Sequence, residues 1–179
     1  MTPTLRIAHA IEFAARKHVD QRRKGARAEP YVNHVAEVAS LLAQATRGRD
    51  ANLVIAGLLH DTLEDTPTRH AELVRHFGRD VADLVREVTD DKRLHKRLRK
   101  RLQVERAPHK SRRAKMLKIA DKTANLRSIL VSPPTDWTAK RSRDYFKWAA
   151  QVVAGCRGVN AFLEREFDKV HAKGARSRA

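Results

Sequence analysis

The chain has 179 residues, which suits one domain or two small ones, and 41% of them are hydrophobic, enough for a core and too many for general disorder. Lysine and arginine outnumber aspartate and glutamate by 38 to 21, so an anionic partner is expected: a nucleic acid, a membrane surface or a phosphorylated small molecule. The single cysteine, Cys156, excludes an internal disulfide and a cysteine-based zinc site, and no apolar run approaches the roughly 20 residues of a membrane span. The N-terminus has no signal-peptide pattern, and we therefore expect an intracellular, cytoplasmic protein without a membrane partner.

The first half of the chain has the spacing of amphipathic helices, with apolar residues three and four positions apart. Three stripes are predicted to face a core: Ile7, Ala8, Ile11, Ala14, Ala15 and His18; Val35, Val38, Ala39, Leu42 and Ala45; and Val81, Leu84, Val85 and Val88. The pair Phe77-Gly78 opens the third stripe, where a glycine suits a helix end. The segment Ala51–Leu59 is apolar on nearly every side, which predicts a helix in the middle of a bundle.

The second half predicts a long helix over Arg112–Leu130, which ends before Pro133-Pro134. A further helical pattern begins near residue 136 and has a break near Gly155–Gly158. No alternating strand pattern, internal repeat or long linker is present.

We therefore expect an all-α protein, a helical bundle of about eight or more helices. A single domain is predicted over residues 1–170, and residues 171–179 are predicted to form a basic, disordered tail.

The apolar helix at 51–59 leads directly into two titratable residues, His60 and Asp61. Glu64 follows four residues after His60, and Asp65 follows four after Asp61, so each pair shares a face if the helix continues. Three carboxylates within about two turns repel one another unless a cation neutralises them.

Two further polar residues lie on predicted apolar stripes: His34 on the second stripe, and Asp121 in the long helix, beside Leu117, Ala120 and Ala124. Together with His60 and Asp61 they give two imidazoles and two carboxylates from three helices. Such a set suits Mn²⁺, Fe²⁺ or Zn²⁺, whereas Ca²⁺ prefers more oxygen ligands. The spaced set predicts a metal site far more strongly than any one of its members.

The basic residues gather in three runs, at Gln21–Arg27, Lys92–Arg101 and Lys140–Arg143. Such runs are typical of a solvated helix face or a nucleic-acid patch, and they also suit a pocket for a polyphosphate. With two tryptophans, two tyrosines and five phenylalanines in the chain, a stacking platform for single-stranded nucleic acid is disfavoured.

Six segments, in order along the chain, together resemble one known family. The sequence is similar to the HD-domain hydrolases, specifically the (p)ppGpp hydrolase domain of the RelA/SpoT proteins and the stand-alone small alarmone hydrolases, the group that includes the metazoan SpoT homologue. The segments are RRKGARAEPYVNH (22–34), AGLLHDTLEDT (56–66), HFGRDVADLVREVTDDK (76–92), KRLQVERAPHKS (100–111), AKMLKIADKTANLR (114–127) and RDYFKWAAQVV (143–153).

The resemblance implies an HD-domain helical fold and a role for each matching residue. One Mn²⁺ would be held by His34, His60, Asp61 and Asp121. Glu64 and Asp65 match the pair that positions and activates the attacking water, and the sequence leaves open which of them accepts the proton. Residues matching substrate contacts are Arg23, Lys24, Tyr31, Lys96, Arg97, Asn125, Arg141 and Tyr145.

The implied activity is hydrolysis of the alarmone (p)ppGpp at its 3′-diphosphate, which gives GDP or GTP and pyrophosphate. No synthetase domain is expected, because the chain ends where one begins in the long proteins. An alternative of the same fold is a (p)ppApp hydrolase or an NADPH 2′-phosphatase. An alternative of another class is a basic nucleic-acid-binding helical module; the complete metal set opposes it, so no specific nucleic-acid partner is expected. The oligomeric state is not predicted.

Overall fold

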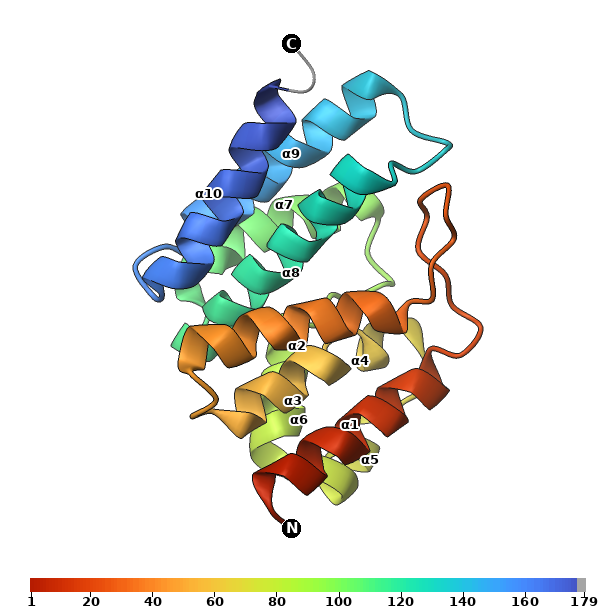
Figure 1. The fold of residues 1–179 in the computed structure, drawn as a ribbon, viewed down its shortest axis with the longest axis vertical. Helices are drawn as coiled ribbons and strands as arrows, with labels where there is room; N and C mark the ends of the chain where they lie inside the picture. Colours follow the sequence, from red (N-terminus) through yellow and green to blue (C-terminus); the bar gives the residue numbers. More distant parts are fainter. Residues whose placement is uncertain (177–179) are drawn as a thin grey trace. The chain divides into compact units, whose positions relative to one another are not determined.

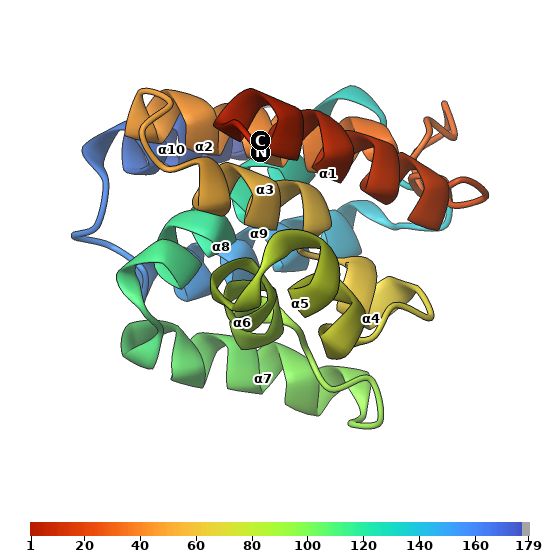
Figure 2. The same ribbon diagram turned by 90° about the horizontal axis from the view of Figure 1, so that it is seen from below.

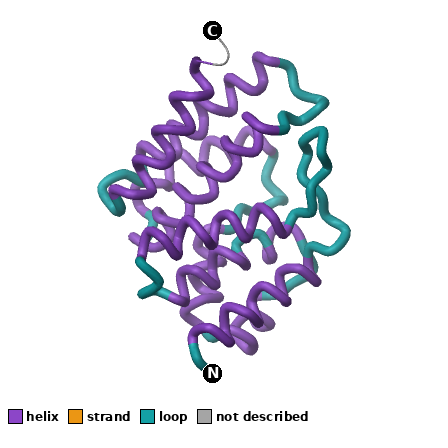
Figure 3. The backbone as a smooth tube through the Cα atoms, viewed as in Figure 1, coloured by secondary structure: helices purple, strands orange, loops and turns teal. Residues whose placement is uncertain are grey.

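The structure is a computed structural model that describes residues 1–176, and within them all regular structure is helical (Figure 3). This confirms the predicted all-α class, and the helices exceed the predicted minimum of eight. None of the described helices is both long and apolar enough to cross a membrane. The helices are α1 (Pro3–Lys17), α2 (Val32–Thr46), α3 (Ala51–Leu59), α4 (Thr62–Asp65), α5 (His70–Phe77), α6 (Arg79–Val88), α7 (Lys96–Arg106), the 3₁₀ turn η1 (Ala107–His109), α8 (Arg112–Val131), α9 (Ala139–Ala154) and α10 (Ala161–Arg176).

The chain forms two compact units whose segments alternate along the sequence. Unit 1 contains residues 1–21 and 30–93, with helices α1 to α6, and unit 2 contains residues 22–29 and the chain from Leu94 onward, with helices α7 to α10. The polypeptide therefore passes from one unit to the other three times. The single domain over 1–170 stays a prediction.

In unit 1 the apolar helix α3 packs against α1, α2 and α6, as its all-round hydrophobicity predicted (Figure 1). The Asp50 side chain caps α3 by accepting a hydrogen bond from the Leu53 amide at 3.0 Å. Gly57 allows the close crossing with α2, because a Cβ at this position would lie 2.7 Å from Leu42 Cδ1. Helices α5 and α6 lie together in the same unit (Figure 2). Gly78 separates them in the chain, at the helix end where a glycine was predicted.

The buried face of α1 differs from the predicted stripe. Ala10, Phe13 and Ala14 are buried, whereas Ile11 is 47% exposed. The large Phe13 ring sets this face, because it packs edge-on against Phe77 of α5 with ring centroids 5.3 Å apart. The second stripe keeps its predicted face except for Ala45, which is half-buried, and all four residues of the third stripe are buried.

Unit 2 is built around α8, which packs against α9 and α10 (Figure 1). Ser111 caps its N-terminus by accepting a hydrogen bond from the Ala114 amide at 3.2 Å, and the helix ends at Val131, before the two prolines. The segment 22–29 joins this unit at the same end: Gly25 forms an isolated β-bridge with Pro134, and the Arg27 amide donates to Ser132 Oγ at 3.2 Å.

The prediction of a disordered tail at 171–179 is wrong for residues 171–176, which continue α10. Gly174 is buried against the Phe146 ring of α9, and His171 lies against the rings of Phe146 and Phe167. These contacts hold the last turns in place although their sequence is polar and basic. Residues 177–179 lie outside the described residues.

Candidate functional site

Unit 1 brings two buried histidines to one aspartate. His34, from α2, is 4% exposed, and His60, at the C-terminus of α3, is 5% exposed. The Asp61 Oδ2 atom lies 3.0 Å from His60 Nε2 and 3.7 Å from His34 Nε2. The two imidazole rings are 5.3 Å apart, centroid to centroid. Three of the four predicted metal ligands therefore meet within this unit.

Hydrogen bonds fix the orientation of both the His60 ring and the Asp61 carboxylate. His60 Nδ1 lies 2.8 Å from the Gly57 carbonyl oxygen, which only accepts, so Nδ1 carries a proton and Nε2 is the ring nitrogen that faces Asp61. The Tyr31 hydroxyl donates to Asp61 Oδ2 at 2.6 Å. Partners of this kind orient the ligands of metal sites.

The predicted catalytic pair lies on α4, a single helical turn, because α3 ends at Leu59 and does not continue through the motif. Glu64 accepts a hydrogen bond from the Asp90 amide at 3.2 Å. Burial raises the pKa of Glu64, and the carboxylates of Asp90 and Asp61 raise it further. Asp65 forms an ion pair with Lys92 and accepts a hydrogen bond from the side-chain Nε2 of Gln21 at 3.4 Å.

Unit 2 places Asp121 in a network with two predicted substrate contacts. Asp121 is 7% exposed and accepts hydrogen bonds from Lys122 Nζ at 2.9 Å and from Asn125 Nδ2 at 2.5 Å. The Arg23 guanidinium donates to Asn125 Oδ1 at 2.9 Å. The buried carboxylate is thus held on both oxygens within its own unit.

Four more predicted substrate contacts also gather in unit 2. The ammonium group of Lys96 lies within electrostatic range of Lys24 and Arg141, and burial, together with these neighbouring cations, lowers its pKa. The Arg141 guanidinium lies 4.8 Å from the centre of the Trp137 ring. The ring of Tyr145 also packs against Trp137, with the two ring centroids 5.4 Å apart.

Arg97 does not join these contacts within the described residues: it is exposed in the first turn of α7, where its amide donates to His95 Nδ1. Its substrate role stays a prediction.

The sequence reasoning missed several side chains that complete these clusters, above all Lys100, Lys122 and Trp148. The spacing of Lys96 and Lys100, one helical turn apart, is a signal that both lie on one face of α7. Both tryptophans of the chain lie close to Tyr145 in sequence, which is a further signal. Tyr31 was predicted only as a substrate contact, and its hydrogen bond to Asp61 was not predicted.

The donors in unit 1 suit a divalent metal ion. Two imidazole nitrogens and a carboxylate oxygen converge, and the contact of His60 Nδ1 with the Gly57 carbonyl oxygen leaves Nε2 as the ring nitrogen that faces the other donors. Nitrogen and oxygen donors without sulfur fit a borderline to hard cation of the first transition row.

The comparisons with known proteins agree with this chemistry. The family model described as HD domain matches residues 10–147. The chain belongs to the HD-domain family.

Within this family, relatives of about the same length are similar along nearly the whole chain. Proteins named guanosine-3′,5′-bis(diphosphate) 3′-pyrophosphohydrolase MESH1 are 51% identical over 158 residues in Homo sapiens and 49% identical over 162 residues in Xenopus tropicalis. These alignments cover 88% and 90% of both chains, respectively. A solved structure described as a metazoan orthologue of SpoT that hydrolyses ppGpp is 45% identical, with a TM-score of 0.92 and coverage of 97% of each chain.

Proposed function

We propose that this protein is a metal-dependent hydrolase of (p)ppGpp, which removes the 3′-diphosphate to release pyrophosphate and GDP or GTP. The observation that carries the proposal is the meeting of His34, His60 and Asp61, with Glu64 and Asp65 on the next helical turn. Relatives about 50% identical over nine-tenths of the chain are named for the same reaction. The cytoplasmic location stays a prediction.

The metal in this proposal is Mn²⁺, held by His34, His60, Asp61 and Asp121. Asp121 is a buried carboxylate on the predicted apolar face of α8, and it matches the last ligand of the family motif. A divalent cation in such a site supplies Lewis acidity and eases the deprotonation of water.

Glu64 and Asp65 divide the handling of the attacking water between them. Glu64 accepts the proton, because its raised pKa brings it closer to the neutral range in which a general base is efficient. Asp65, fixed by Lys92 and Gln21, orients the water. The water oxygen bonds to the phosphorus that is attached to the 3′-oxygen. The bond between this phosphorus and the 3′-oxygen breaks, and the 3′-oxygen leaves and takes up a proton.

The basic residues of unit 2 bind the nucleotide. Lys96 and Arg141 neutralise phosphate charge, Arg23 and Asn125 contact the nucleoside, and Tyr145 offers a ring for stacking. Lys24, Tyr31 and Arg97 complete the substrate contacts that the family resemblance implies. Replacing Lys96 or Arg141 by alanine is expected to raise KM with kcat little changed, as the loss of a ground-state contact does.

A substrate panel tests the proposal. The purified chain is assayed with ppGpp, ppApp and NADPH, with Mn²⁺ and with EDTA, and the products are separated by anion-exchange chromatography. Conversion of ppGpp to GDP and pyrophosphate, abolished by EDTA and restored by Mn²⁺, is expected. Preferential release of phosphate from NADPH or hydrolysis of ppApp would replace the proposed substrate. Salt-dependent binding to generic DNA without any hydrolysis would favour the nucleic-acid-binding alternative.

A further inference from the structure

Two lysine ammonium groups in unit 2 lie over the ring of one tryptophan, Trp148. The ammonium group of Lys100, on α7, and that of Lys122, on α8, each lie 4.6 Å from the centre of the Trp148 ring. Lys100 also lies 5.3 Å from the centre of the Tyr145 ring. The faces of these rings partly offset the charge of the cations, as cation–π contacts do.

Carboxylates partner some cations of this cluster, but not all. Lys122 donates to Asp121 at 2.9 Å, and Arg141 lies 3.4 Å from Asp136. Lys96 and Lys100 have weaker compensation: among the described residues, Asp136 and Asp144 act on them only through their charge, and less strongly than the neighbouring cations do. Burial lowers the pKa of Lys100, and repulsion from Lys96, Lys122 and Arg141 lowers it further. An anion that reaches Lys100 would relieve this repulsion.

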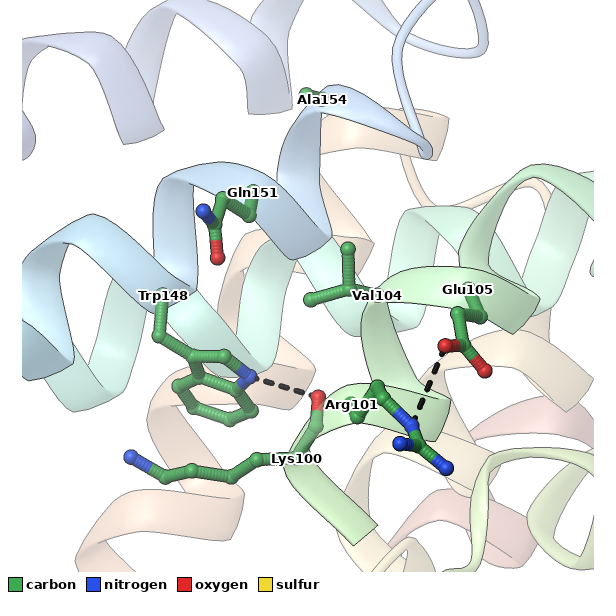
Figure 4. Close-up of a pocket in the computed structure, with 7 residues that line it drawn as sticks. All are labelled: Lys100, Arg101, Val104, Glu105, Trp148, Gln151 and Ala154. Carbon is green, nitrogen blue, oxygen red and sulfur yellow. Dashed lines mark hydrogen bonds and ion pairs between the residues drawn. The ribbon is translucent and has the colours of Figure 1, made fainter. Parts of the chain in front are cut away.

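Lys100 is also accessible and firmly placed. It lines an open groove of about 560 Å³ between α7 and α9, together with Trp148 and Val104 (Figure 4). Figure 4 shows the Lys100 side chain running along the indole, whose N–H donates to the Lys100 carbonyl oxygen at 3.0 Å. This hydrogen bond fixes the ring, so that the ring and the lysine form a preorganised anion-binding surface.

The position of Lys100 along the cluster indicates which anion it takes. Lys100 lies one helical turn beyond Lys96 on α7, a rise of about 6 Å. Lys96 and Arg141 are the proposed contacts for the polyphosphate, so Lys100 extends the same row of cations past them. The proposed substrate occurs in two forms, and its uncleaved 5′ chain carries two or three phosphates.

We propose that Lys100 is a specificity-determining residue that binds the terminal phosphate of the longer 5′ chain, so that pppGpp is bound more tightly than ppGpp. This inference rests on the proposed function. Trp148 acts as a positioning residue, since it holds the Lys100 stem and ammonium in place.

The test compares KM and kcat for pppGpp and ppGpp in the wild-type enzyme with Mn²⁺ and in the variants Lys100→Gln and Lys100→Arg. Lys100→Gln is expected to raise KM for pppGpp about tenfold, as the loss of one charge-assisted contact does. For ppGpp the rise stays below about threefold, and kcat is unchanged for both. Lys100→Arg restores the preference for pppGpp. Arg101→Gln is the matched control, because Arg101 lines the same groove but pairs with Glu105.

Three results would overturn the inference: an equal rise in KM for both nucleotides in Lys100→Gln, an unchanged KM for both, or the same rise in KM for pppGpp in Arg101→Gln. Calorimetric titration with inorganic triphosphate and pyrophosphate tests the anion site at Lys100 separately from the proposed hydrolase function. If the wild-type protein hydrolyses neither nucleotide, the proposed function fails, and loss of the triphosphate preference in Lys100→Gln still supports the anion site. Retention of that preference refutes the site. Should Lys100→Gln fold poorly by circular dichroism, Lys100→Met, which keeps the stem over Trp148, is measured instead with the same expectation.

Discussion

The hydroxyl group of Tyr31 supports the metal site through Asp61, and its removal is the sharpest test of the site in unit 1. The O–H···O distance of 2.6 Å is that of a charge-assisted hydrogen bond, which contributes about 1.5–3 kcal/mol. At about 1.4 kcal/mol per tenfold change, Tyr31→Phe should weaken Mn²⁺ binding by about 10- to 100-fold, the range seen when such supporting groups are removed. The phenylalanine keeps the ring contacts with His18 and His34, so the fold should be unaffected.

The assay is a calorimetric titration of the EDTA-treated protein with Mn²⁺, paired with activity measured over a range of Mn²⁺ concentrations. Saturating Mn²⁺ should restore most of the turnover of Tyr31→Phe, because the lost free energy lies in metal binding. Tyr145→Phe, which alters the other tyrosine of the chain, is the control and should leave the Mn²⁺ affinity unchanged. A wild-type Mn²⁺ affinity in Tyr31→Phe would refute the idea that this hydrogen bond supports the metal ligand.

Three further predictions test separate parts of the structure. Asp65→Asn should retain Mn²⁺ in the calorimetric titration and lose at least about 100-fold in kcat; wild-type turnover would contradict its role. Since the pKa of Glu64 is raised in the folded state, its protonated form favours folding, and the stability that protonation provides is lost as the pH rises above the ordinary value of 4.5. Glu64→Gln should therefore raise the Tm of the EDTA-treated protein at pH 8 but not at pH 4, and equal shifts at both would exclude this account. Gly174→Ala places a Cβ about 2.0 Å from Phe146 Cε1 and should cost about 1–3 kcal/mol in urea unfolding, whereas a neutral result would show that α10 shifts freely.

The sequence predicted helices best where hydrophobicity and capping residues agree. The helix expected at Ala51–Leu59 has those bounds in the structure, and the long helix begins at the expected Arg112 and ends one residue later than predicted. Exposure of Ile11 was not predictable from periodicity, because the choice of buried face depends on where Phe13 meets Phe77. The last turns of α10 were missed because Gly174 is buried by contact with Phe146, and a small residue carries no hydrophobic signal.

The candidate site was predictable in its residue types and less so in its contacts. Spacing and burial alone indicated His34, His60 and Asp61, and the structure brings these three together. The hydrogen bond from Tyr31 to Asp61 and the stacking of Lys100 on Trp148 depend on side-chain directions, which spacing does not encode.

The alternation of the two units along the chain has a consequence for the order of folding during synthesis. The segment 22–29 belongs to unit 2, and its partner Ser132 lies 105 residues after Arg27. At about 5–20 residues per second, a ribosome needs roughly 5–20 seconds to add those residues. Until then Arg23 has no Asn125 to bind, whereas every helix of unit 1 has already been made. The histidine pair is therefore ready to assemble well before the contact between Arg23 and Asn125 can form, and a translational pause between residues 93 and 125 would prolong that interval.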